Sequence, residues 1–442
     1  MEEESCVKTA GIKKRMITIV TASKKTAAQI AVMQRKNYLK FFLSCIVCCC
    51  LHSTKGNAQQ NINKANITFI DYVGFPEAVS TWDDIGFSSR YNKVVVGVTN
   101  HRDKVALFDY DAASGKMTNN GLIGDLAHLR NFQWQAKIHS KITEGADGCM
   151  YFSTDGGESR EEYFMDHPAG YGGGFFMKWH PQTKNLTNLG MGMQYESIKD
   201  VDIDPQSGKL YGVSYPQVHF LVYDPGKNSM KDFGRLGSSH VPRVLFTDWW
   251  GNCYYVDWRQ RLVKYQKDAD SLLFAQNSLP AFPGTPGGKI VTGITAYAKD
   301  KKNNVIYLIT YGAKIVAFYP EKNGIGKVVD LGGVADSSSK VEPWGPYVPN
   351  LNLGDNGKLY YIVGGHGNYV IENKTVLIEF DPKTRKHTII YQYPVEELSE
   401  ATGSDTKDKE GNLYFLGRRD LDKFDHSVPF LIKFNPAKKV QK

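Results

Sequence analysis

The sequence has little of three things that would narrow its function: cysteine, net charge and long apolar runs. Five of the seven cysteines lie in residues 1–58, so only Cys149 and Cys253 remain in the rest of the chain. Residues 1–58 also hold 10 of the 54 Lys and Arg and 3 of the 46 Asp and Glu, which leaves 44 basic and 43 acidic residues. A net charge of +1 over residues 59–442 argues against a general affinity for nucleic acid. No apolar run is long enough for a transmembrane segment.

The first 58 residues are predicted to be an N-terminal extension and signal peptide. Met33–Lys40 is positively charged, Phe41–Leu51 (FFLSCIVCCCL) is a short apolar segment, and Gly56-Asn57-Ala58 has small residues where a signal peptidase cuts. We therefore expect translation from Met33, cleavage after Ala58 and a secreted or periplasmic protein. A lipoprotein is the lesser alternative, because the residues before Cys45 are a poor context for lipidation.

A turn followed by a β-rich strand recurs seven times in the rest of the chain. The clearest copy is Lys137–Phe152 (KIHSKITEGADGCMYF), in which Ile138 and Ile142 face one way and His139 the other, before a tight Asp-Gly turn. A second strand follows each copy and often ends in a dipeptide such as Asp-Pro, which is a turn signal. The seven turns are Tyr91-Asn92, Asp147-Gly148, Ser207-Gly208, Gly251-Asn252, Asn303-Asn304, Asn356-Gly357 and Glu410-Gly411.

The repeat has the length of a propeller blade. Its period of about 43–60 residues predicts that residues 59–442 form a seven-bladed β-propeller of four-stranded antiparallel blades. The last copy ends before a fourth strand, so Asn66–Val73 (NITFIDYV) is predicted to complete that blade and close the ring from the N-terminal side. Cys149 and Cys253 have the same position in different blades, so we expect both to be buried strand residues and a disulfide between them to be improbable.

The connections of such a blade differ on its two faces. The turns on one face are short, whereas the long connections on the other face, which we call the mouth, carry most of the notable histidines and arginines. The residues placed there are His139, His167, Tyr171, Tyr215, His219, His240, Arg243, Trp344, His366 and Arg418. Each has a structural interpretation as well, since a lone strand histidine is commonly a hydrogen-bonded structural residue. Aromatic residues at 163–176 either pack the long connection or offer a stacking surface for sugar rings. The glycines at 172–174 precede no helix and are not a phosphate loop.

Four segments carry a resemblance: QAKIHSKITEGADGCMYFST (135–154), YGVSYPQVHFLVYDP (211–225), DFGRLG (232–237) and HVPRVLFTD (240–248). They resemble a secreted bacterial propeller group that includes the ulvan lyases and, more distantly, the oligogalacturonate lyases. The resemblance implies a polysaccharide lyase of carbohydrate metabolism that cleaves a uronate-containing glycan, an anionic polysaccharide or oligosaccharide, by β-elimination. In that chemistry a cation neutralises the carboxylate, a base removes the neighbouring proton, and an acid protonates the leaving oxygen.

The resemblance also implies roles for single residues. His139 corresponds to the first catalytic histidine, Arg235 or Arg243 to the cation, and Tyr215 or His219 to the base or acid. Substrate-binding roles would fall to His167, Tyr171, His240, Trp344, His366 and Arg418. The chain departs from the pattern at Asp155, where a second histidine is expected, and at His219, where a tyrosine is expected. His167 is the candidate to replace the missing histidine.

Other functions stay open. Because of the departures at Asp155 and His219, the alternative is a non-catalytic propeller that binds a glycan or a protein. A metal-dependent lactonase or esterase would use carboxylate and amide ligands near the axis, and the residues near such positions are Asp83, Asp200, Asn350 and Asp405. A divalent metal, zinc or calcium, is also conceivable at the mouth, although no ligand spacing demands a cofactor. The histidines that would hold it are His139, His167, His219 and His240.

Overall fold

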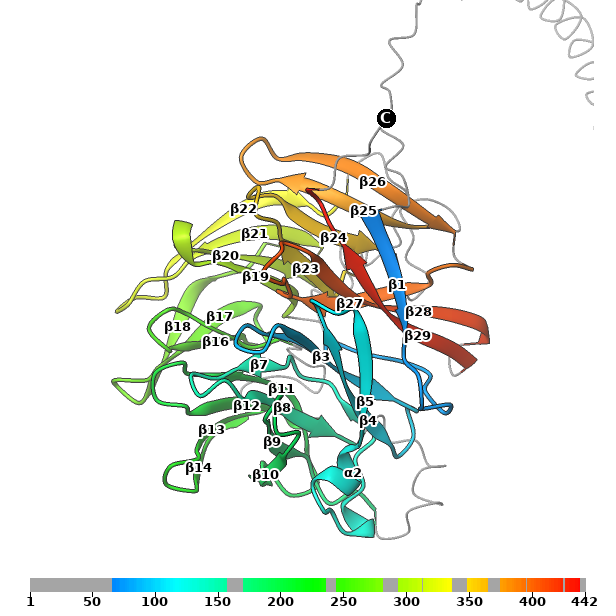
Figure 1. The fold of residues 1–442 in the computed structure, drawn as a ribbon. Coiled ribbons are helices and arrows are strands. Elements are labelled where there is room, and N and C mark those ends of the chain that lie inside the picture. The colour runs from blue at the N-terminus through cyan, green and yellow to red at the C-terminus, as the bar shows by residue number, and fades with distance from the viewer. Residues whose placement is uncertain are drawn as a thin grey trace, which may run out of the picture. The chain divides into compact units, whose positions relative to one another are not determined.

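The computed structural model describes residues 66–156, 170–235, 244–280, 293–311, 313–335, 348–364, 374–394, 396–423 and 426–437. These residues form an all-β propeller (Figure 1). The predicted signal peptide, and with it the predicted location of the protein, lies outside the described residues. No described helix is long and apolar enough to cross a membrane.

Four of the sheets have four antiparallel strands each. The first contains β2 (Ile85–Ser88), β3 (Lys93–Thr99), β4 (Val105–Asp111) and β5 (Lys116–Leu122). The second contains β11 (Ser197–Ile203), β12 (Leu210–Tyr215), β13 (His219–Asp224) and β14 (Ser229–Arg235). The third contains β15 (Phe246–Thr247), β16 (Cys253–Val256), β17 (Arg261–Gln266) and β18 (Ser271–Ser278). The fourth contains β19 (Ile294–Asp300), β20 (Val305–Thr310), β21 (Lys314–Tyr319) and β22 (Lys327–Gly333).

Two sheets are larger. One has five strands, β6 (Lys137–Ile138), β7 (Thr143–Glu144), β8 (Met150–Asp155), β9 (Phe175–Trp179) and β10 (Leu186–Met191). The other has eight, β23 (Asn350–Leu353), β24 (Leu359–Val363), β25 (Lys374–Asp381), β26 (Lys386–Pro394), β27 (Glu400–Ser404), β28 (Leu413–Lys423), β29 (His426–Phe434) and β1 (Ile67–Asp71). Short helices lie in connections: α2 (Ile123–Leu126), η2 (Asn131–Gln133) and η4 (Lys301–Asn303).

The four-stranded antiparallel blades of the prediction are confirmed, but seven separate sheets are not found. The described residues form six hydrogen-bonded sheets, because β23 and β27 pair in parallel at Asn350↔Gly403 and Leu351↔Ser404. This short pairing joins two sets of four strands into one sheet. The strand predicted at 66–73 is present as β1, which pairs antiparallel with β29, for example at Phe69↔Ile432.

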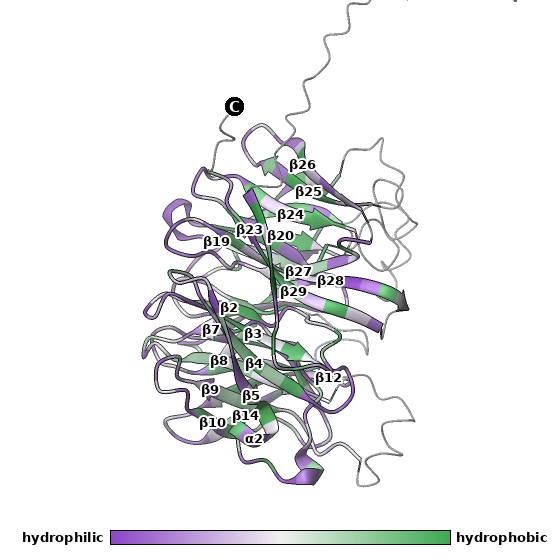
Figure 2. Ribbon diagram, turned by 45° about the vertical axis from the view of Figure 1, so that its right-hand side comes forward, coloured by the Kyte–Doolittle hydropathy of each residue, from purple (hydrophilic) through white to green (hydrophobic). Residues whose placement is uncertain are grey.

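The inner strands of the sheets are buried on both faces, which explains why strands such as β3 and β16 are almost continuously apolar, whereas outer strands such as β14 and β18 are partly exposed. In β3, Val94 and Val96 belong to a core cluster with Tyr414 of β28, whereas the intervening Val95 packs with Ile138 and Phe152 of the five-stranded sheet. Alternate side chains of one strand therefore point to opposite faces of its sheet, and each set packs against a different neighbouring sheet. Figure 2 shows the apolar residues concentrated in the strands and hydrophilic residues in the turns.

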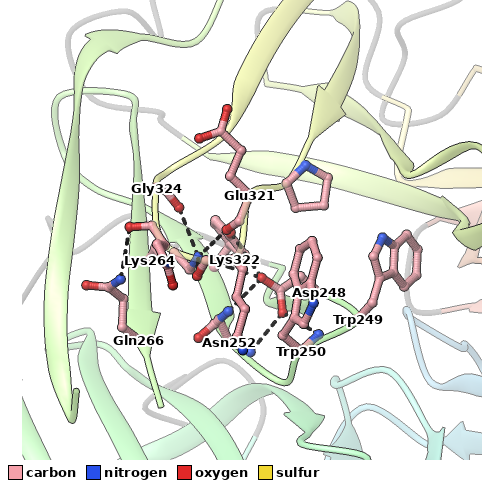
Figure 3. Close-up of polar contacts among 12 residues, drawn as sticks. Asp248, Trp249, Trp250, Asn252, Lys264, Gln266, Glu321, Lys322 and Gly324 are labelled. Carbon is pink, nitrogen blue, oxygen red and sulfur yellow. Dashed lines mark hydrogen bonds and ion pairs between the residues drawn. The ribbon is translucent and has the colours of Figure 1, made fainter. Parts of the chain in front are cut away.

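Buried lysines connect neighbouring sheets as well. Lys264 of β17 donates hydrogen bonds to the backbone carbonyls of Glu321, Lys322 and Gly324, at 2.6, 2.9 and 2.9 Å, in the turn between β21 and β22 (Figure 3). Burial lowers the pKa of Lys264, and the nearby Asp248 carboxylate, 3.9 Å from Nζ, opposes that shift. The lysine thus ties the third sheet to the fourth.

Candidate functional site

The mouth is the face at which the first strand of each sheet begins and the second strand ends. A small cavity opens there on the propeller axis. It measures about 20 Å³, which is room for about one water molecule. Its lining comes from six stretches of chain: Trp82, Asp83, His139, Val244, Thr295, Pro349 and Thr402.

Trp82 is the centre of a packed aromatic and cationic cluster beside this cavity. Its ring is stacked on His139 (centroids 5.6 Å apart, planes at 14°) and is tilted against His101 (5.6 Å). The Lys137 ammonium lies 4.7 Å from the centroid of the indole ring, a cation–π contact. The Thr402 hydroxyl donates a hydrogen bond to the Trp82 backbone carbonyl. His139 is consequently only 5% exposed, although it lines the cavity.

Asp155 joins this cluster to the next sheet. Its carboxylate accepts hydrogen bonds from Lys199 Nζ (2.5 Å) and from Ser197 Oγ (2.9 Å), and all three residues are buried. Burial alone would raise the pKa of Asp155, but the charges of Lys199 and Lys137 outweigh it and hold that pKa below its usual value. Lys199 also lies 4.7 Å from the ring centroid of Tyr215. The acid that stands where a histidine was expected is therefore the centre of a buried ion-pair network.

The glycine run after the long connection is a packing feature. Trp134 Nε1 donates to Gly170 O at 3.1 Å, and Gln135 Nε2 donates to Gly173 O at 3.1 Å. A Cβ on Gly174 would lie 2.3 Å from Thr154 O, so only glycine lets these backbones approach. The segment is packed closely between its neighbours.

Tyr171 is fixed within this segment. Its hydroxyl donates to Gln135 Oε1 at 3.0 Å, and its ring contacts Trp134. Burial, followed by the Asp155 charge, raises the pKa of Tyr171 well above its usual value. Phe175 and Phe176 are core residues of β9 and offer no stacking surface.

His219 and Arg235 lie farther from the axis than His139. They face each other across β13 and β14, the third and fourth strands of their sheet. Three strand spacings separate β11 from β14, a distance of about 14 Å. His219 Nδ1 is 2.8 Å from Asp232 Oδ2, and Arg235 is exposed at the end of β14. The structure thus brings His139 and Tyr215 to one network and places His219 and Arg235 on the outer rim.

The other predicted site residues divide into two groups. Arg418 is buried in an ion pair with Glu400 (2.8 Å) and is also 2.9 Å from Asp420, so its charge already has partners. Five predicted residues lie outside the described residues: His167, His240, Arg243, Trp344 and His366.

The carboxylates considered for a lactonase do lie near the axis, together with lysines. Lys141 donates its backbone N–H to Asp200 Oδ1 at 3.0 Å, and its ammonium interacts electrostatically with Asp405 and Asp83. Burial and the charge of Asp83 raise the pKa of Asp200 well above its usual value. The Asn350 side chain is hydrogen-bonded to backbone groups of Ile362 and Ala401 in the eight-stranded sheet. Within the described part of the chain, no group of three or more His, Cys, Asp or Glu side chains is placed to hold a metal ion.

Cys149 and Cys253 are free thiols and both are buried, as predicted; Cys253 begins β16 and Cys149 directly precedes β8. The prediction missed Trp82, Lys137 and Lys199. Lys137 had a usable signal, since it stands two residues before His139 in an alternating stretch and so shares its face. Trp82 and Lys199 had none, because lysines are rarely buried and a single tryptophan marks no face.

Comparisons with protein-family models and with curated proteins find no match. Solved propellers are similar. The crystal structure of the RRP9 WD40 repeats gives a TM-score of 0.52 at 9% identity, covering 85% of this chain and 99% of that one. The structure of U3-55K gives 0.51 at 9% identity, with 84% and 99% covered. At such identities the likeness shows the fold alone: this chain is a β-propeller similar in architecture to WD40-repeat proteins.

Proposed function

We propose that this chain is a non-catalytic binding propeller that recognises a protein through its mouth. One observation carries the proposal: His139, the first candidate for catalysis, is packed between Trp82 and a cavity with room for about one water. Only 5% of His139 is exposed, so a sugar ring has almost no access to it as a catalytic base.

The state of the neighbouring charges supports the same conclusion. Asp155, Lys199 and Lys137 neutralise one another inside the protein, and Arg418 is neutralised by Glu400. A lyase needs a cation available to a substrate carboxylate, whereas a binding scaffold needs a rigid support for exposed loops. Paired buried charges suit the second requirement.

The test combines a search for activity with a search for binding. The purified chain is incubated with alginate, polygalacturonate, ulvan and heparin at several pH values, with and without Ca²⁺ or Zn²⁺. We expect no rise in the ultraviolet absorbance that marks a new double bond, and we expect the immobilised chain to enrich specific peptides from a displayed library. A rise in absorbance that His139→Ala abolishes would overturn the proposal.

The lyase is the second candidate, with an anionic polysaccharide as its substrate. It is favoured by a series of side-chain contacts at one mouth that connects His139 to Tyr215. The residues between them are Trp82, Lys137, Asp155 and Lys199. Secretion by the predicted signal peptide fits either candidate and is tested by locating the mature protein outside the cytoplasm.

We also infer that the scaffold works as seven blades closed by β1. The eight-stranded sheet consists of two antiparallel sets, β23–β26 and β27–β29 with β1, that share only two residue pairs. This link is parallel, unlike the ladders inside each set, and it is no longer than the shortest of them, β23–β24 with two pairs, whereas β28–β29 has nine. The pairing of β1 with β29 would then join the two ends of the propeller.

A further inference from the structure

One exposed turn at the mouth is held by hydrogen bonds and carries large side chains into solvent. It connects β16 to β17 and spans Asp257–Arg261. Asp257 Oδ1 accepts the backbone N–H groups of Arg259 and Arg261, both at 2.9 Å. Gln260, whose φ is +61°, exchanges side-chain hydrogen bonds with Gly293, and the Arg259 carbonyl accepts from Ser278 Oγ at 2.8 Å. The turn is thereby tied to two neighbouring segments.

The two arginines of this turn each contact an aromatic ring. Arg259 lies 4.6 Å from the ring centroid of Trp258, which is 57% exposed. Arg261 lies 5.5 Å from the ring centroid of Phe274 on β18, which is 43% exposed. Tryptophan and arginine are the residues most enriched where a few side chains supply most of a protein–protein binding energy. A rigid turn presents them at little entropic cost.

The charges of the two pairs differ. Arg261 is neutralised by Asp257, whose Oδ2 is 2.7 Å from Nη2 and 2.9 Å from Nε. Among the described residues no carboxylate pairs with the Arg259 guanidinium, which is exposed. The patch of Trp258, Arg259, Arg261 and Phe274 therefore offers one unneutralised cation beside two apolar surfaces.

We propose that this patch anchors a partner protein through a carboxylate that lies next to an apolar side chain. The inference rests on the proposed binding function and specifies its surface and its partner chemistry. A polyanionic glycan or nucleic acid fits less well, because such ligands gain affinity from many cations, and here one arginine is available on a chain whose residues 59–442 are nearly neutral. An acidic residue of a peptide would instead receive the planar guanidinium while its neighbour covers the Trp258 ring.

The experiment uses a displayed library of 12-residue peptides selected on the purified full chain. We expect recovered peptides to contain Asp or Glu beside a large apolar residue. Their affinity, measured by fluorescence anisotropy, should fall at least about tenfold in Trp258→Ala and in Arg259→Ala. Tyr319→Ala, which removes an exposed aromatic at the end of β21 on the opposite face, should leave the affinity unchanged. Urea unfolding verifies that each variant is folded.

A charge exchange shows whether the contact is direct. Arg259→Glu should abolish binding of the selected peptide, and replacing the acidic residue of that peptide by Lys should restore it. Peptides that bind Trp258→Ala and Arg259→Ala as tightly as the unchanged chain would overturn this inference but leave a binding propeller. Loss of heparin or polygalacturonate oligosaccharide binding in the same variants, with no peptide recovered, would overturn the partner class. Failure of every probe to bind would count against the proposed function itself.

Discussion

At the scale of single residues, buried lysines do much of the joining that apolar side chains do elsewhere. Lys141 is buried, and its ammonium donates to Thr406 Oγ1 at 3.0 Å, to Ile85 O at 3.2 Å and to Ser404 O. Burial lowers the pKa of Lys141, and the surrounding carboxylates, first Asp405, oppose that shift. The ammonium therefore links three inner segments around the axis and adds a second donor to carbonyls that already accept from Ile142 N–H and Thr406 Oγ1.

Asp155→Asn should destabilise the protein, because it leaves Lys137 and Lys199 as buried cations with no carboxylate between them. The free energy of unfolding at pH 7 should fall by roughly 3–5 kcal/mol. Because the pKa of Asp155 is lowered in the folded protein, its contribution is present above an unfolded pKa of about 3.9 and is lost as the pH falls below that value. The difference between the two proteins should therefore stay the same between pH 7 and 5 and shrink below about pH 4, as measured by urea unfolding at about pH 7, 5 and 3.

Asp270→Asn is the matched control. Asp270 pairs with Lys231 at 2.5 Å, but both side chains are more than half exposed, so this variant should change stability little. If Asp155→Asn were no more damaging than Asp270→Asn, the buried network would not be a stabilising feature of the mouth.

At the scale of elements, strands could be predicted where turns and connections could not. The predicted stretch at ALFDYD is β4, and the one at FMKWHP is β9, because alternating or continuous apolar residues between turn signals report burial directly. The Lys137–Phe152 hairpin instead contains three short strands, β6, β7 and the start of β8. Its middle residues include Lys141, whose ammonium bonds to Ile85 and Ser404 of other sheets and to Thr406, long-range contacts that no local pattern reveals.

The candidate site was predictable to the same limited extent. Placement of His139 and Tyr215 at one mouth followed from their position relative to the repeats. The packing of Trp82 on His139 and the pairing of Lys199 with Asp155 arise between sheets, so neither could be predicted from one repeat. Sequence alone also could not tell which glycines were needed for close packing.

Gly174→Ala and Gly172→Ala should differ in effect although they are two residues apart. The new Cβ at position 174 would lie 2.3 Å from Thr154 O and 2.7 Å from Ile198 N, both backbone atoms that cannot move aside. At position 172 the nearest atom is Phe132 O at 3.6 Å, an ordinary contact. We expect Gly174→Ala to lower the free energy of unfolding by roughly 1–3 kcal/mol and Gly172→Ala to be nearly neutral, in parallel urea titrations. Equal stability of the two would mean that the strip is not closely packed.

At the scale of the whole molecule, a propeller is stable only if its first and last sheets are held together. Core clusters join neighbouring sheets, since Tyr414 and Leu416 of β28 pack with Val94 and Val96 of β3. This contact connects the C-terminal strands to the N-terminal sheet. The β1–β29 pairing is a second link between the same two parts of the chain, made by the backbone.

Removal of β1 tests how much that second link contributes. A chain that begins at Tyr72 should be compared with one that begins at Asn66, since both lack the N-terminal extension and only the second retains β1. The shorter chain loses buried Ile67 and the contact of Phe69 with Phe430, whose ring centroids are 5.0 Å apart. Its free energy of unfolding should be lower by on the order of 3 kcal/mol or more. It should also elute as larger species in size-exclusion chromatography, because β29 would present an unpaired edge. If the two chains were equally stable and monomeric, the apolar contacts between β3 and β28 would suffice to hold the ends together, and β1 would be a dispensable addition to the last sheet.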